Sequence, residues 1–132
     1  MQRINISSGT PWEPVAGYSR AVAAGDYVFV AGCTSVAGGE VVHEGDAGAQ
    51  TTRAIANVAE ALERLGAGLA DVVRTRMFVT DISRWEEIGR AHGEFFGDVR
   101  PATSMVEVAA LIDPRMLVEI EADAYRPGIG AG

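Results

Sequence analysis

The stretch LVEIEADAY, residues 117–125, alternates apolar and charged side chains along most of its length. Because successive side chains of a β-strand point to opposite faces, this alternation predicts a strand with one apolar and one acidic face. The apolar face carries Val118, Ile120, Ala122 and Ala124. The opposite face carries Leu117, Glu119, Glu121, Asp123 and Tyr125. We expect the apolar face to meet helices, which makes this strand a central element of the fold.

A second strand, predicted over residues 72–81, also sets a charged row behind an apolar one. Arg74, Arg76 and Phe78 share one face, opposite Val73, Thr75, Met77 and Val79. Arginines of this strand can form a ladder with the glutamates of residues 117–125. Two interpretations of the charged face remain open: an exposed face with weak ion pairs, or a buried interface between subunits.

An amphipathic helix is predicted over residues 49–65. Its apolar side chains Ile55, Val58, Leu62 and Leu65 recur at helical spacing. Asp46 is expected near the N-cap, and the glycines at 66 and 68 follow the end of the pattern.

A second helix is predicted over residues 83–96, with Trp85, Ile88, His92 and Phe95 on one stripe. Ser83 is the expected N-cap, and Glu86 three residues later completes a capping box. Gly97 follows the last apolar position.

Further short segments have β character, and together with the helices they define the fold class. Residues 27–34 and 103–109 give strong strand patterns, while 3–6, 19–23 and 40–42 give weaker ones. The order of strands and helices, without an internal repeat, predicts an α+β fold in which a mixed sheet carries both helices on one face. The length of 132 residues fits one domain over residues 1–132.

Composition and charge exclude several function classes. The net charge of −7, from 11 basic and 18 acidic residues, opposes binding to a phosphate backbone, and no basic patch with interleaved aromatics is visible. Nucleic acid is therefore not an expected partner. Neither a signal peptide nor a membrane span is expected, so a cytoplasmic protein without a membrane partner is predicted. Cys33, His43 and His92 have no zinc-ligand spacing, and no metal or other cofactor is expected.

Several segments, in their order along the chain, resemble the RidA/YjgF/UK114 family of enamine and imine deaminases. They include residues 17–22 (GYSRAV), 28–32 (VFVAG), 71–75 (DVVRT), 100–108 (RPATSMVEV) and 118–122 (VEIEA). The resemblance covers nearly the whole chain. It implies a chorismate-mutase-like fold assembled as a homotrimer, with a small-molecule cleft at each subunit boundary and no cofactor.

The family's chemistry is hydrolysis of reactive enamines and imines to a keto acid and ammonia, and the resemblance assigns roles to residues of this chain. Glu119 takes the position of the catalytic glutamate that handles the attacking water. Tyr18 and Gly32 match substrate-binding positions, and His92 falls where relatives often carry a tyrosine beside the cleft. Cys33 follows Gly32 and is either a ligand-facing nucleophile or a small apolar filler.

The chain departs from the family's pattern at its anion-binding corner. Thr103 stands where an arginine grips the substrate carboxylate, and Met105 stands where a cysteine is frequent. A neutral hydroxyl is a weaker partner for a carboxylate than a bidentate guanidinium. A replacement cation could come from Arg90, Arg100 or a neighbouring chain. Two hypotheses follow: a deaminase-like hydrolase, or a trimer that binds or senses a small metabolite without turnover.

Overall fold

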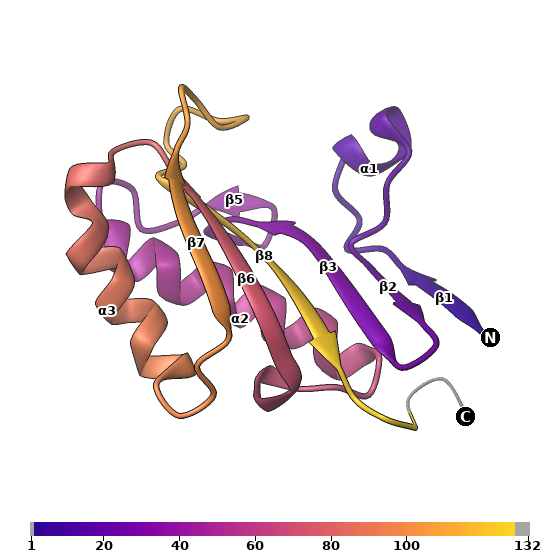
Figure 1. Cartoon of the computed structure of the whole chain (residues 1–132). Coiled ribbons are helices and arrows are strands. Elements are labelled where there is room, and N and C mark those ends of the chain that lie inside the picture. The colour runs from indigo at the N-terminus through magenta and orange to yellow at the C-terminus, as the bar shows by residue number, and fades with distance from the viewer. Residues whose placement is uncertain (1, 129–132) are drawn as a thin grey trace.

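A six-stranded mixed sheet is the centre of the structure, a computed structural model that describes residues 2–128 (Figure 1). The ends of the predicted domain, residue 1 and residues 129–132, lie outside the described residues. The strands are β1 (Arg3–Ile6), β2 (Ala21–Ala24), β3 (Tyr27–Cys33), β6 (Val72–Val79), β7 (Ala102–Glu107) and β8 (Val118–Tyr125). Their spatial order is β1-β2-β3-β8-β6-β7. Only the pair β6–β7 among these is parallel.

Two helices cover one face of this sheet, α2 (Ala47–Arg64) and α3 (Trp85–Phe96); in Figure 1 α2 lies behind the strands and α3 stands at the left, beside β7. A two-stranded hairpin, β4 (Val36–Ala37) and β5 (Glu40–Val41), follows β3. Short 3-10 turns over Leu69–Asp71 and Ile82–Arg84 precede β6 and α3. The α+β prediction is confirmed, and the predicted strand limits agree within two residues. The strand β4 and the helix α1 (Trp12–Ala16) were not predicted.

The apolar face of β8 forms the middle of the core, as its alternation predicts. Val118, Ile120, Ala122 and Ala124 are all 0% exposed, and they meet α2 and the neighbouring strands. A fully buried Val or Ile contributes about 1.5–3 kcal/mol relative to exposure, so this row stabilises the sheet against the helices. Glu119 and Glu121, on the opposite face, are only partly buried.

The start of β6 contradicts the predicted alternation. A β-bulge between Val72 and Arg74 adds one residue to the strand, which shifts the side-chain pattern. Val73 is 48% exposed and does not belong to the apolar row, whereas Val72 is buried. From Thr75 onward the predicted alternation holds, with Thr75, Met77 and Val79 buried against the helices.

The helix starts were predicted with mixed success. Asp46 caps α2, because its carboxylate accepts a hydrogen bond from the backbone N–H of Ala49 at 3.0 Å. Ser83 does not cap α3. Its hydroxyl and backbone N–H both donate to Asp81, at 2.6 Å and 3.0 Å, because the carboxylate is the stronger acceptor and the helix begins through a 3-10 turn.

The predicted apolar stripe of α3 is also corrected at one end. Trp85 is 58% exposed and lies off the buried face. Ile88, His92 and Phe96 are buried, together with Ala91. The stripe is therefore shifted by part of a turn, and His92 lies inside it.

The N-terminal arm carries α1 and stands apart from the two large helices (Figure 1). Glu13, 5% exposed, holds the arm together: its Oε2 accepts from the backbone N–H and the hydroxyl of both Ser8 and Thr10. Gly17, with φ of 75°, ends α1 in the left-handed conformation. The arm thereby positions Trp12 and Tyr18 beside the sheet, near β3.

The sheet face that α2 and α3 do not cover combines aromatic side chains and ion pairs. Tyr27 packs against Phe29 and Tyr125 with ring centroids 6.1 Å and 5.0 Å apart, although the three rings are 41–48% exposed. Arg76 pairs with Glu121 and Asp123, each at 3.2 Å. The predicted ladder between β6 and β8 is confirmed for Arg76. Glu119 is not part of it.

Candidate functional site

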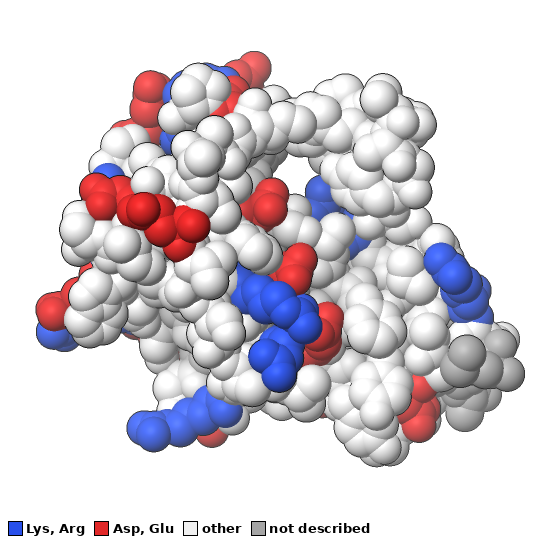
Figure 2. Space-filling model, turned by 45° about the horizontal axis from the view of Figure 1, so that its top comes forward, with Lys and Arg blue, Asp and Glu red and all other residues white. Residues whose placement is uncertain are grey.

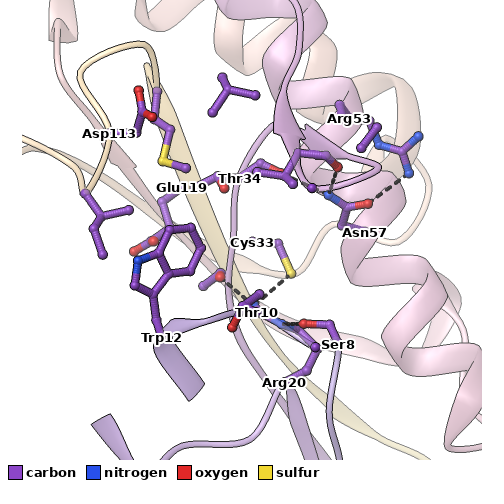
Figure 3. Close-up of a pocket in the computed structure, with 18 of the residues that line it drawn as sticks. Ser8, Thr10, Trp12, Arg20, Cys33, Thr34, Arg53, Asn57, Asp113 and Glu119 are labelled. Atoms are coloured by element: carbon purple, nitrogen blue, oxygen red, sulfur yellow. Dashed lines mark hydrogen bonds between the residues drawn. The ribbon is translucent and has the colours of Figure 1, made fainter. Parts of the chain in front are cut away.

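A cavity of about 770 Å³ opens between the N-terminal arm, the end of β3, the β4–β5 hairpin, the C-terminal half of α2 and the loop before β8. Figure 3 labels lining residues from the N-terminal arm, the end of β3, α2, β8 and the loop before it. Four of the seven predicted site residues line this cavity: Tyr18, Gly32, Cys33 and Glu119. The sheet register explains their meeting, since β3 lies directly beside β8.

Gly32 allows the Glu119 side chain to lie across the backbone of β3. A Cβ atom at Gly32 would lie 2.6 Å from Cδ and 2.8 Å from Cγ of Glu119, closer than real Cβ contacts. A β-bulge between Val30 and Cys33 interrupts the pairing with β8 at this point. Glycine is therefore required so that the carboxyl group can reach its place in the cavity.

The environment of Glu119 favours the protonated carboxyl. Burial raises its pKa, the negative charge of Glu121 raises it further, and the positive charge of Arg20 partly offsets both. A carboxyl with a raised pKa holds and releases a proton closer to neutral pH than a free glutamate does. The arrangement is suited to proton transfer with a water or a small ligand in the cavity.

Arg20 is a cavity residue that was not predicted, although it belongs to a segment that carried the family resemblance. Its Nη1 donates to the carbonyl oxygens of Gly32 at 2.6 Å and Ala31 at 3.3 Å, and its Nε donates to Ser8 Oγ at 3.1 Å. The guanidinium carbon lies 5.8 Å from the centre of the Tyr18 ring. The sequence did contain a signal for Arg20. It lies two residues after Tyr18, and residues two apart in an extended segment share a face.

Cys33 is 3% exposed, and the structure favours one of its two interpretations. Its Sγ lies 3.4 Å from the Ala31 carbonyl oxygen and 3.5 Å from Arg20 Nη1. Burial raises the pKa of the thiol against the lowering effect of Arg20. A buried thiol with a raised pKa is a poor nucleophile, so this position fits a small packing residue.

The other three predicted site residues, Thr103, Met105 and His92, do not line this cavity in the same chain. Thr103 pairs with Thr75 and Met105 with Met77 across the β6–β7 ladder, so both side chains follow the helix-covered side. His92 lies between these strands and α3. Glu119 lies on the opposite face of the sheet, with β6 between β8 and β7.

Neither arginine considered as a replacement cation lines the cavity. Arg90 forms an ion pair with Glu86 at 2.9 Å on α3. Arg100 adopts a positive φ of 52° and donates to the carbonyl of Gly97, as a turn residue does. The cations that do line the cavity are Arg20, Arg53, Arg64 and Arg115.

Two further parts of the lining escaped the prediction. Asp113 and Arg115, which are joined by hydrogen bonds in the loop before β8, border the cavity. On α2, Asn57 donates to the carbonyls of Thr34 and Val36 and accepts from Arg53, so it fixes the chain after β3. These contacts join residues far apart in sequence, which local patterns do not predict.

The described part of the chain shows neither a metal site nor a membrane-spanning helix. Within residues 2–128 no three His, Cys, Asp or Glu side chains gather in a way that could hold a metal ion. Over the same residues, none of the helices is both long and apolar enough to cross a bilayer.

Comparison with known proteins gives the family. The family model described as Endoribonuclease L-PSP matches residues 9–126. The chain belongs to this family, known also as YjgF/YER057c/UK114. A crystal structure of a YjgF/YER057c/UK114 member from Mycobacterium tuberculosis is 54% identical, with a TM-score of 0.86 over 95% of this chain and 100% of that one. The YjgF gene product of E. coli is 30% identical, with a TM-score of 0.79 over 92% and 94% of the two chains.

Relatives known by sequence agree with this assignment. An uncharacterized protein of Streptomyces coelicolor is 43% identical over 94% of this chain and 92% of its own length. The 3-aminoacrylate deaminase RutC of Acinetobacter baylyi is 34% identical over 94% of this chain and 98% of its own length. The resemblance inferred from the sequence segments is therefore confirmed at the level of the family.

Proposed function

We propose that this protein hydrolyses small imines or enamines to a carbonyl compound and ammonia, with Glu119 as the proton-transferring residue. The observation that carries the proposal is the Glu119 carboxyl group, which lies across Gly32 inside the cavity and has a raised pKa. The similarity to a 3-aminoacrylate deaminase supports the same reaction class. The reaction needs water and a proton carrier and no redox partner.

The proposed steps use the residues around Glu119. The ionised carboxylate accepts a proton from a water molecule while the water oxygen bonds to the carbon of the protonated imine, which gives a neutral carbinolamine. The protonated Glu119 then delivers its proton to the amine nitrogen. The carbon–nitrogen bond breaks while the Glu119 carboxylate takes the hydroxyl proton, so that ammonia leaves and the carbonyl forms. Arg20 keeps the backbone of Ala31 and Gly32 in place and limits the charge repulsion around Glu119.

The complete site is proposed to lie between two copies of the chain in a homotrimer. Thr103 is on β7, the strand at one edge of the sheet, and it lies on the other face from Glu119. A ligand beside Glu119 can therefore meet Thr103 only if another copy supplies it. The exposed rings of Tyr27, Phe29 and Tyr125 support an interface on the uncovered sheet face, because such an apolar cluster gains stability when buried.

Cleavage of RNA is not supported by the charges, although the family model carries an endoribonuclease description. The net charge is −7, and on the face drawn in Figure 2 arginines and acidic side chains are interleaved. A ribonuclease would need a continuous basic surface for the phosphate backbone.

A coupled assay tests the proposal. An oxidase generates an imine from D-alanine, or from a primary amine without a carboxylate, and release of the carbonyl product is followed with and without the protein. We expect acceleration by the wild-type protein and loss of it in Glu119→Gln. The matched control Glu94→Gln changes an exposed glutamate of α3 and should keep the activity. If no imine of either kind is hydrolysed faster than in buffer, the proposed reaction is wrong.

Binding without turnover is the second candidate, and the neutral Thr103 favours it because a hydroxyl at this position offers a substrate carboxylate no charged partner. A ligand that binds only the folded protein raises its melting temperature. Stabilisation by keto acids or amides, with no carbonyl product from any imine, would select this function over hydrolysis.

A further inference from the structure

A chain of side-chain hydrogen bonds leads from α3 through the sheet to Thr103. Nε2 of His92 lies 2.9 Å from Oγ1 of Thr75, and Oγ1 of Thr75 lies 2.8 Å from Oγ1 of Thr103. Oγ1 of Thr103 donates to the carbonyl oxygen of Pro101 at 3.1 Å. Thr75 is 0% exposed and His92 is 9% exposed, so this chain is shielded from water for most of its length.

The direction of every hydrogen bond in this chain follows from its last member. A carbonyl oxygen has no hydrogen, so the hydroxyl hydrogen of Thr103 is used on Pro101. Thr75 must then donate its only hydroxyl hydrogen to Thr103. His92 must in turn donate from Nε2 to Thr75, because Thr75 has no second hydrogen. This is the one assignment in which all three contacts are hydrogen bonds.

The Thr103 hydroxyl therefore donates its hydrogen to Pro101 and accepts the hydrogen of Thr75 with one lone pair, which leaves its second lone pair free. A free lone pair accepts a hydrogen bond from an N–H or O–H group and repels a carboxylate oxygen. Thr103 is exposed on the edge strand β7, so a ligand can approach this residue. The hydroxyl therefore has the opposite hydrogen-bonding character to the arginine that other family members carry there.

We propose that His92 and Thr75 orient Thr103 as a hydrogen-bond acceptor, and that the site selects ligands with an uncharged N–H or O–H donor group in place of a carboxylate. The inference rests on the proposed function in one respect, namely that Thr103 of one copy faces the cavity of another. Amides and alcohols of small keto compounds, and the imines derived from them, have the required donor group. Thr103 is then a specificity residue, and Thr75 and His92 are positioning residues.

The surroundings of His92 support a fixed imidazole. Its ring packs 4.6 Å from the ring of Phe96, and burial lowers its pKa, so the neutral ring is favoured. A neutral imidazole has one N–H, and the chain requires this hydrogen on Nε2. The hydrogen-bond directions thus fix one tautomer of His92.

The tautomer is the first test, and it does not depend on the proposed function. Nitrogen chemical shifts of ¹⁵N-histidine-labelled protein distinguish the two neutral tautomers. His43 is the only other histidine, so the variant His43→Gln assigns the signals. We expect the Nε2–H form for His92 at neutral pH. The Nδ1–H form would overturn the inferred hydrogen-bond directions and would leave the deaminase proposal untouched.

The second test compares two stable probes of the same shape, pyruvamide and pyruvate. Binding of each is measured by calorimetric titration of the wild-type protein. We expect pyruvamide to bind about tenfold more tightly, the ratio that corresponds to one hydrogen bond replaced by a repulsive contact. Equal binding, or tighter binding of pyruvate, would contradict the inferred selectivity. Binding of neither probe would overturn the placement of Thr103 in a ligand site.

Substitutions then assign the selectivity to its residues. Thr103→Val keeps the shape of the side chain and removes the hydroxyl, so the preference for pyruvamide should disappear. His92→Phe should reduce it, because without the hydrogen from His92 the Thr75 hydroxyl is no longer held as a donor to Thr103, and the Thr103 hydroxyl is free to reorient. Thr52→Val, the same change at an exposed position of α2, should leave it intact. A preference that survives in Thr103→Val would contradict the role of the hydroxyl.

Discussion

Glu119 and Gly32 form a pair in which one residue depends on the absence of a side chain in the other. The carboxyl group occupies the place that a Cβ of residue 32 would fill, 2.6 Å from its Cδ. The structure therefore gives a reason for glycine at this position that is independent of turn geometry. It also makes the position of the carboxyl group sensitive to a single methyl group.

The variant Gly32→Ala tests this dependence. The added methyl group must displace the Glu119 carboxyl, and a misplacement of about 1 Å lowers kcat by about a hundredfold. Imine hydrolysis by the purified variant measures the effect. The matched control is Gly93→Ala, where an added Cβ has no neighbour within 4 Å and activity should be unchanged. Full activity in Gly32→Ala would show that imine hydrolysis does not depend on the exact position of the Glu119 carboxyl group.

The variant Glu119→Gln is expected to be more stable than the wild type at neutral pH. Burial, and then the charge of Glu121, raise the pKa of Glu119 in the folded protein. The folded state therefore prefers the protonated acid, and this contribution to stability is present below the pKa of the unfolded chain and is lost as pH rises through the folded pKa. Urea unfolding at pH 4 and pH 8 measures it. We expect nearly equal stability at pH 4 and a higher midpoint for the variant at pH 8.

At the residue scale, the sequence indicated Glu119, Tyr18, Gly32 and Cys33, and the structure brings these four to one cavity. Arg20 was missed although it contacts Gly32, because its role depends on hydrogen bonds to the β3 carbonyls of Ala31 and Gly32. The polar chain through Thr75 was also missed. Its members are 17 and 28 residues apart in sequence, and only the β6–β7 pairing and the packing of α3 bring them together.

At the scale of elements, the N-terminal arm depends on one carboxylate. Burial alone would raise the pKa of Glu13. The hydrogen bonds from Thr10, Ser7 and Ser8 outweigh this effect and lower the pKa to about 2. Four of the hydrogen bonds that this carboxylate accepts come from Ser8 and Thr10. The arm therefore positions Trp12 and Tyr18 through the charge of Glu13.

The variant Glu13→Ala should loosen this arm without unfolding the sheet. Hydrogen bonds to a charged group contribute about 1.5–3 kcal/mol each, so we expect faster amide exchange over residues 8–18. Hydrogen exchange followed by mass spectrometry compares this segment with α2. In the wild type, the Glu13 contribution is present above pH 4.5 and is lost as pH falls through about 2, so the protection of the arm relative to the intrinsic exchange rate should fall in this window. Unchanged protection of the arm in Glu13→Ala would contradict this account.

The elements that the sequence predicted well are those with long periodic patterns, namely α2, α3, β6 and β8. The errors lie where a local feature interrupts the pattern. The bulge after Val72 leaves Val73 48% exposed, and the carboxylate of Asp81 caps the 3-10 turn that precedes α3, so Ser83 does not cap the helix. The helix α1 has only five residues and depends on Glu13, so it has no periodic signal of its own.

At the scale of the whole molecule, the uncovered face of the sheet is the feature that a single chain does not explain. Phe29 is 45% exposed and packs against Tyr27, which also packs against Tyr125. If this face is the trimer interface, the variant Phe29→Asp places an unpaired charge in it and should dissociate the assembly. Light scattering should give the mass of three chains for the wild type and of one chain for the variant. A wild-type mass of one chain would remove the proposed shared site.

The most direct test of the shared site mixes two variants that are inactive separately. Glu119→Gln removes the proton-transferring carboxyl, and Thr103→Trp fills the place of the ligand on β7. If each site combines Glu119 of one copy with Thr103 of another, refolding an equal mixture should restore about a quarter of wild-type imine hydrolysis, the fraction of sites that receive both intact residues in a symmetric oligomer. If the mixture is as inactive as the separate variants, the two residues do not act in one site between copies.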